Sequence, residues 1–194
     1  MSIANFKKNL SDLNRIIYFD KNDYLREKSS DELMMKNVIL EGEKLLGQSN
    51  NENDLFFLYG TLGNLYRIIG QPQRALTYLN SCLELAQKDG KIQKEVVTLI
   101  RIGEAWKYAN EHLKALRTFD EAKDKCKDHE VYEDFILQHK GKCLMELGKL
   151  EEAEQCLLKA LKLRNMKNDY SLINSTQKAI EYVNRMKTVI LKDD

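Results

Sequence analysis

The chain has 194 residues, of which 43% are hydrophobic and 31% are charged, and its formal net charge at neutral pH is +1. This composition is sufficient for a core beneath a well-solvated surface, and it argues against intrinsic disorder. A near-neutral charge also argues against wholesale binding to nucleic acid or to a membrane surface, both of which favour a basic excess. One proline and nine glycines leave few helix breakers, so long helices are expected.

The chain shows no targeting or membrane signal. Its first residues include no apolar stretch typical of a secretory leader, and its apolar runs are far shorter than the ~20 residues of a membrane helix. The four cysteines form no Cys-x-x-Cys pair, which favours a reduced, cytoplasmic setting.

His139 and Cys143 have the i, i+4 spacing of two metal ligands on one helix. A third ligand, Cys126 or Cys156, would have to come from elsewhere, and cysteines more often fill small core positions. We therefore predict no metal site and no cofactor.

Residues 1–50 are predicted to form N-terminal helices and a degenerate capping repeat. A separate helix is expected over residues 3–18. The repeat would then use residues 19–28 as its first helix, although Asn22-Asp23 stand at the usual Leu-Gly position. Its second helix is expected from Ser30-Asp31 to Gly47, with Gly42 at a position for a small residue. The polar residues 49–53 separate this degenerate repeat from the regular ones.

Three stretches, residues 54–90, 91–129 and 130–167, repeat one pattern of residue types. Each has Gly, bulky, turn, Ala, bulky and small residues at offsets 0, 3, 7, 12, 16 and 19. The residues are Gly63, Tyr66, Gly70, Ala75, Leu79 and Cys82; Gly103, Trp106, Asn110, Ala115, Phe119 and Ala122; and Gly141, Leu144, Gly148, Ala153, Leu157 and Ala160. The pattern predicts helix-turn-helix units that must stack to bury their apolar faces.

The turns and the end of the array can also be predicted from the sequence. Gly70 is expected to end the first helix of its repeat in the left-handed conformation, and Pro72 suits the first turn of the next helix. Extra residues between repeats are expected in loops at 87–91 and 127–130. Residues 169–192 are predicted to form an amphipathic C-terminal capping helix. The expected fold is a single all-α domain, an α-solenoid of antiparallel helix pairs.

The pattern over residues 56–167 resembles the tetratricopeptide repeat (TPR), most closely in Leu62-Gly63-Asn64-Leu65-Tyr66 with Gly70 and Ala75. The spacing of about 40 residues is similar to the longer-repeat subclass of kinesin light chains, Leu-Gly-Asn adaptors and bacterial peptide sensors. Repeat three departs from the pattern at Lys140 and Leu144, and no repeat has the usual proline near its end. The resemblance implies a right-handed superhelix with a groove lined by the first helix of each repeat.

The resemblance also implies which positions line that groove. They are Phe57, Gly60, Asn64, Arg67 and Ile68 in repeat one; Val97, Ile100, Glu104, Lys107 and Tyr108 in repeat two; and Phe135, Gln138, Lys142, Met145 and Glu146 in repeat three. The side-chain amides among them can pair with the extended backbone of a bound peptide. The cations can hold its carboxylates, and the aromatic rings can contact its apolar side chains. The two-carboxylate clamp known in the family uses lysine at the positions that Gly60 and Gln138 hold here. That clamp is therefore not predicted.

Each candidate has a structural alternative. Asn64 can simply be solvated, Glu104 and Lys107 can pair with each other at i, i+3, and Phe57 and Phe135 can belong to the core. The basic residues Lys159, Lys162, Arg164 and Lys167 are expected to form a modest surface patch. They lack the interleaved aromatic residues of a nucleic-acid site.

The predicted function is a non-enzymatic, cytoplasmic interaction module that binds a peptide or protein segment in the groove, without nucleic acid or membrane partners. The alternative is a peptide-responsive regulatory protein or a self-assembling scaffold that acts through protein contacts. A monomer or weak homodimer is expected.

Overall fold

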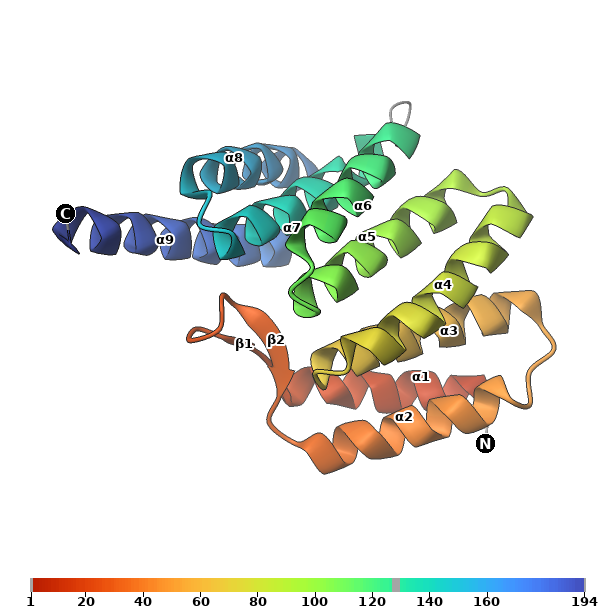
Figure 1. Ribbon diagram of the computed structural model, residues 1–194. Coiled ribbons are helices and arrows are strands. Elements are labelled where there is room, and N and C mark those ends of the chain that lie inside the picture. Colours follow the sequence, from red (N-terminus) through yellow and green to blue (C-terminus); the bar gives the residue numbers. More distant parts are fainter. Residues whose placement is uncertain (1, 127–129, 194) are drawn as a thin grey trace.

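The computed structural model describes residues 2–126 and 130–193, so most of the loop predicted at 127–130 lies outside the described residues. Helix pairs succeed one another along the chain and stack into a curved array (Figure 1), which confirms the α-solenoid. A small β-hairpin interrupts the helices near the N-terminal end.

The N-terminal region differs from the prediction. Helix α1 (Ile3–Asp12) leads into a 3₁₀ turn, η1 (Leu13–Arg15), so the helix expected over residues 3–18 ends early. Residues 17–29, expected to contain a helix, instead hold strands β1 (Ile17–Asp20) and β2 (Arg26–Ser29). Helix α2 (Glu32–Leu46) comes next and packs against α1, so α1 takes the place of the missing first helix.

Local sequence explains this hairpin. The run Ile17-Tyr18-Phe19 is rich in residues that favour strands, and Asn22-Asp23 favour a turn. The strands pair antiparallel, with Ile17 opposite Ser29 and Asp20 opposite Arg26. The turn is completed by Tyr24 and Leu25 at φ values of 50° and 57°, a conformation that is uncommon for such bulky residues.

The repeats form three helix pairs, and α9 closes the array. The helices are α3 (Glu52–Ile68) and α4 (Pro72–Asp89), α5 (Ile92–Tyr108) and α6 (His112–Lys125), α7 (Glu133–Glu146) and α8 (Leu150–Lys167), and α9 (Tyr170–Asp193), with the 3₁₀ turn η2 (Glu130–Tyr132) before α7. Helix α3 contacts α5, and α5 contacts α7, so the first helices of the pairs form one continuous layer. Gly70 has a φ of 74° and Pro72 begins α4, both as predicted.

The glycines of the repeat pattern allow paired helices to approach closely. A Cβ atom on Gly103 would lie 2.4 Å from the ring of Phe119, and one on Gly63 would lie 2.5 Å from Leu79. Gly141 meets Leu157 in the same way, at 2.8 Å. In each repeat, the bulky side chain 16 residues after the glycine, on the second helix, therefore occupies the space that a side chain at the glycine position would need.

Helix α9 packs on α8 through the buried residues Ala179 and Val183. Arg164, expected in a surface patch, is instead only 2% exposed. Its Nε donates to Asp134 Oδ2 at 2.9 Å, and its Nη1 donates to Thr176 Oγ1 at 2.6 Å. Arg164 therefore links α7, α8 and α9. Within residues 2–126 and 130–193, no helix combines the length and apolar character needed to cross a membrane.

We predict that Gly103→Ala lowers the free energy of unfolding by about 1–3 kcal/mol, because the added methyl group overlaps the fully buried ring of Phe119. Chemical denaturation measures this loss. Gly47→Ala is the control, since its Cβ would be 3.8 Å from the nearest atom. It should change stability by less than about 0.5 kcal/mol. Equal effects of the two substitutions would contradict the close helix crossing.

Candidate binding groove

The β-hairpin lies across the layer formed by α3, α5 and α7. Its side chains and backbone contact Arg67 on α3, Tyr108 on α5 and Glu146 on α7. At its tip, the ring of Tyr24 lies 6.4 Å from the ring of Tyr182 on α9. The hairpin thus occupies part of the predicted groove, and it projects from the α1–α2 end of the array toward α9 (Figure 1).

Glu146 is the centre of the first group of contacts that hold the hairpin. Arg26 Nε donates to Glu146 Oε1 at 3.1 Å, and Lys107 Nζ lies 3.3 Å from the same oxygen. Burial alone raises the pKa of Glu146, but the hydrogen bond from Arg26 and the charge of Lys107 lower it further, so the net pKa is below the usual range. The Glu146 side chain is 1% exposed, and it stays ionised because two cations surround it.

Arg67 is the centre of the second group. It is 2% exposed and donates to Glu27 of the hairpin and to Asn64 Oδ1. Its guanidinium carbon lies 4.5 Å from the centre of the Tyr108 ring, and the Tyr108 hydroxyl oxygen accepts a hydrogen bond from the Glu27 backbone N–H. Burial lowers the pKa of Arg67, while Glu104, Tyr108 and Glu27 raise it above its ordinary value. Arg67 is therefore a permanent buried cation between α3 and the hairpin.

Glu104 lies between these residues and α7. Its Oε1 is 3.1 Å from His139 Nδ1 and 3.9 Å from Arg67 Nη1. Burial raises the pKa of Glu104, but the charges of Arg67 and His139 outweigh that effect and leave the pKa well below the usual range. The negative charge of Glu104 is thus already compensated within the chain.

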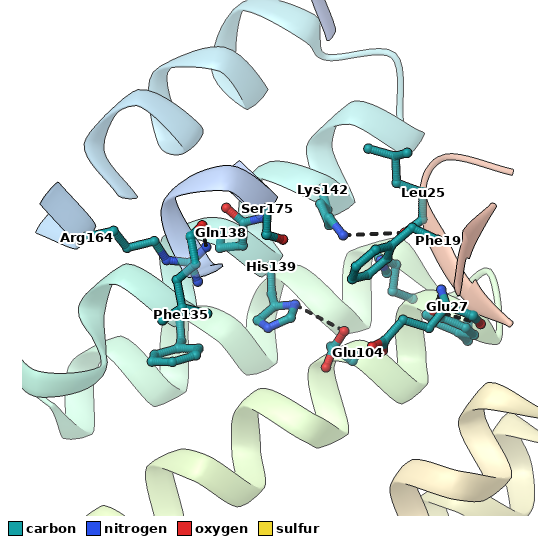
Figure 2. A pocket seen from close by; sticks show the side chains of 13 residues that line it. Phe19, Leu25, Glu27, Glu104, Phe135, Gln138, His139, Lys142, Arg164 and Ser175 are labelled. Carbon is teal, nitrogen blue, oxygen red and sulfur yellow. Dashed lines mark hydrogen bonds and ion pairs between the residues drawn. The ribbon is translucent and has the colours of Figure 1, made fainter. Parts of the chain in front are cut away.

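Lys142 and Gln138 lie one turn apart on α7 and face a cavity beneath the hairpin (Figure 2). Lys142 is 7% exposed; its Nζ donates to the Leu25 backbone oxygen at 3.4 Å and lies 4.6 Å from the Phe19 ring centre. Burial, reinforced by the charge of Lys107, lowers its pKa to about 8. Both Nε2 and Oε1 of Gln138 are buried, and neither has a hydrogen-bond partner in the part of the chain that the structure describes.

A second hollow of about 260 Å³ lies between α5 and α7, and it shares Glu104, Phe135 and His139 with the cavity beneath the hairpin. Apolar residues of both helices line it, together with Tyr132 from η2. Arg101, Glu104 and His139 provide its polar groups. We call this surface the apolar hollow; its apolar lining residues are Val97, Ile100, Tyr132 and Phe135.

The predicted groove residues divide into four sets. The residues brought together beneath or against the hairpin are Asn64, Arg67, Glu104, Lys107, Tyr108, Gln138, Lys142 and Glu146. Ile100 and Phe135 line the apolar hollow with Val97. Gly60, on α3, lies against the side chain of Arg101.

Three predicted groove residues belong to the core instead. Ile68 and Met145 are buried in hydrophobic clusters. Phe57 packs edge-on against Phe6 of α1, with ring centres 6.2 Å apart. The extra N-terminal helix pair covers this part of α3, which explains the difference for Phe57. The alternative pairing of Glu104 with Lys107 is not seen, because Lys107 pairs with Glu146. Asn64 is not simply solvated, since it accepts from Arg67.

Sequence reasoning missed Arg26, Glu27, Arg101 and His139 as groove residues. The strand-forming run before Asn22-Asp23 was a usable signal for the hairpin, but no local pattern shows where a hairpin docks. Arg101 and His139 stand outside the family groove positions used for the prediction. The described residues contain no group of three or more His, Cys, Asp or Glu side chains able to hold a metal ion.

We predict that Arg26→Ala loosens the hairpin, because it removes a cation from the buried Glu146 carboxylate. Backbone amides of residues 17–29 should then exchange with solvent at least about tenfold faster, equivalent to a loss of about 1.4 kcal/mol. Hydrogen exchange measured by NMR tests this. The control is Lys28→Ala on the same strand, because the ion-pair partners of Lys28 among the described residues, Asp20 and Asp23, both lie inside the hairpin. Similar exchange in both variants would contradict the docking role of Arg26.

We predict that Lys142→Met raises the melting temperature at pH 7, because it removes a buried charge that has no carboxylate partner among the described residues. A lysine whose pKa is about 8 in the folded chain and 10.5 in the unfolded chain binds fewer protons when folded. Wild-type stability should therefore rise relative to the variant between these pH values. Thermal melts from pH 7 to pH 10.5 test this. A difference in melting temperature between wild type and variant that stays constant with pH would show that Lys142 is not a buried cation.

Sequence comparison matches residues 58–89 and 136–165 to the tetratricopeptide repeat family. No curated protein matches this chain in sequence.

Solved structures of several repeat proteins resemble the fold. The apo form of RapI has a TM-score of 0.66 and 18% identity over 94% of this chain and 62% of its own. A Rap protein complexed with Competence and Sporulation Factor has a TM-score of 0.76 and 16% identity over 96% of this chain and 49% of its own. PlcR of Bacillus thuringiensis, complexed with the peptide PapR7 and DNA, has a TM-score of 0.64 and 16% identity over 75% of this chain and 53% of its own.

The chain thus spans about half to two thirds of the length of these proteins. Identities this low establish the fold alone, and a fold does not by itself define a function. Residues 58–89 and 136–165 thus match the tetratricopeptide repeat, and the helix pairs share the fold of the Rap structures.

Proposed function

We propose that the chain is a non-enzymatic interaction module that binds a peptide or protein segment in the part of the groove that the hairpin leaves open. The observation that carries this proposal is the apolar hollow between α5 and α7. Val97 and Phe135 are partly exposed there, while Ile100 forms a more buried surface. Partly exposed apolar residues in a concavity are the usual receptors for side chains of a bound segment.

Arg101 gives the hollow a charge preference. Its guanidinium lies over Gly60, where a Cβ atom would be only 2.5 Å from Nη1. No carboxylate of the described residues lies within ion-pairing distance of Arg101, and burial lowers its pKa. An arginine in this setting gains from an incoming carboxylate. We therefore expect the bound segment to combine an apolar side chain with an acidic group.

The neighbouring structures are consistent with this proposal. The Rap structure contains Competence and Sporulation Factor, and the PlcR structure contains the peptide PapR7. In this chain, the inner-layer charges Arg67, Lys107 and Glu146 hold the hairpin in place. Recognition by a preorganised surface, rather than bond-making chemistry, is what this arrangement provides.

A second candidate function is peptide-responsive regulation, and the docked hairpin favours it. Arg26 and Glu27 satisfy groove residues with the same groups that an external segment would offer: a cation, a carboxylate and a backbone N–H. A partner that competed for Arg67 or Glu146 would displace the hairpin and change the exposed surface.

The cytoplasmic setting and the monomer or weak homodimer remain predictions, and light scattering at several concentrations tests the latter.

Selection from a displayed random-peptide library tests the lead proposal. We expect the wild-type chain to enrich peptides with an apolar and an acidic residue, and Val97→Asp to weaken their binding by about tenfold or more, since it places a charge in the hollow. Leu113→Asp is the control, because Leu113 is 68% exposed on α6 and lies outside the hollow. Peptides that bind Val97→Asp as well as wild type would assign recognition to another surface.

A further inference from the structure

Two adjoining cavities lie beneath the hairpin, between α7 and α9. Their volumes are about 110 Å³ and 330 Å³, and both are lined by Phe19, Leu25, Lys142, Leu172 and Ser175. We call them together the hairpin cavity. The larger part ends at exposed residues of α9, including Asn174 and Lys178. The space greatly exceeds that of one water molecule, for which about 10–15 Å³ suffices.

Gln138 supplies an unused hydrogen-bonding group to the hairpin cavity. The residue is 3% exposed, and neither Nε2 nor Oε1 has a hydrogen-bond partner within residues 2–126 and 130–193. A side-chain amide offers both donors and acceptors, and leaving them unpaired in the interior is unfavourable. In Figure 2 the Gln138 side chain lies beside Ser175 of α9, at the wall of the cavity. The inner part of the cavity therefore suits a ligand that can pair with an amide.

Lys142 supplies a positive charge that has no ion-pair contact among the described residues. It lies four residues after Gln138 on α7, so both side chains project from the same helix face. Its ammonium contacts a backbone oxygen and an aromatic ring, and no carboxylate of the described residues forms an ion pair with it. The nearby carboxylates are already engaged: Glu27 pairs with Arg67, and Glu104 lies against Arg67 and His139.

Three lining residues give the cavity an apolar surface. Phe19 and Leu25 come from the hairpin, and Leu172 comes from the first turn of α9. Leu25 is 8% exposed and packs with the core of α7 and α8, which fixes the hairpin tip. A ligand in this cavity is thus offered a cation, an amide and an apolar surface.

We propose that the hairpin cavity binds a carboxylate-bearing ligand of about the size of one amino-acid residue. Lys142 would hold the carboxylate, Gln138 would pair with an amide group of the ligand, and Phe19, Leu25 and Leu172 would contact an apolar side chain. The inference goes beyond the proposed function, because its site is built from the hairpin and α9 as well as α7. The C-terminal residue of a peptide and a small organic acid share this chemistry.

NMR titration of the full chain tests the proposal, with the backbone amides of Leu25, Leu172 and Ser175 as reporters. The probes are N-acetyl-leucine, N-acetyl-leucinamide and 4-methylpentanoate. N-acetyl-leucine should give saturable shifts and bind about tenfold or more tightly than the amide, which lacks the charge for Lys142. Tighter binding of N-acetyl-leucine than of 4-methylpentanoate assigns a peptide C-terminus; equal binding assigns an organic acid. No saturable shift with either acid, or equal binding of N-acetyl-leucine and its amide, would overturn the proposal.

Variants of the chain locate the site and separate it from the apolar hollow. Lys142→Met should abolish the preference for acid over amide, and Gln138→Met should abolish the preference of N-acetyl-leucine over 4-methylpentanoate if a peptide C-terminus is the ligand. Lys162→Met, at an exposed position of α8, is the matched control and should behave as wild type. Val97→Asp should also bind N-acetyl-leucine normally, so loss of peptide recognition and loss of this site are distinguishable. An unchanged acid preference in Lys142→Met would contradict the assignment.

Discussion

The buried ion pairs between the hairpin and the inner helices are the constraint on which the rest of the groove depends. Arg26 and Lys107 surround Glu146, and Arg67 meets Glu27 and Glu104. Charges removed from water this far are unfavourable alone, and they persist only with close partners and hydrogen bonds. Removing the hairpin would leave the Arg67 and Glu146 side chains, now 3% and 1% exposed, short of partners. Groove and hairpin therefore stabilise each other.

The helical array could be predicted from the sequence because its determinants are local and repeated. Gly63, Gly103 and Gly141 recur in the same relation to a bulky residue 16 positions later, and the structure places each of these pairs in contact. The predicted turn at Gly70 with Pro72 is correct for the same reason, since its backbone requirements lie within a few residues. Repetition makes such signals reliable, because three independent copies agree.

The docked hairpin could not be predicted because its determinants are distant in the chain. Arg26 meets Glu146 across 120 residues, and Glu27 meets Arg67 across 40. The strand-forming run at Ile17-Tyr18-Phe19 indicates a strand, but the side chains that fix its position are on helices far along the chain. The same limit applies to the site residues. Family spacing identified Arg67, Lys107 and Lys142, but it gave no indication that the first two are engaged internally while Lys142 lacks a carboxylate.

This difference between engaged and unengaged charges separates structural from functional roles in the groove. Arg67 and Lys107 each face a carboxylate, so their burial is explained by the hairpin and the helix contacts they stabilise. Lys142 and Gln138 are also buried, but they have no comparable partners among the described residues. A buried cation and an unpaired amide that lower stability have no structural explanation in the described residues, and groups with this property are typical of binding sites. The hairpin thus both fills one part of the groove and covers a second cavity that has its own ligand chemistry.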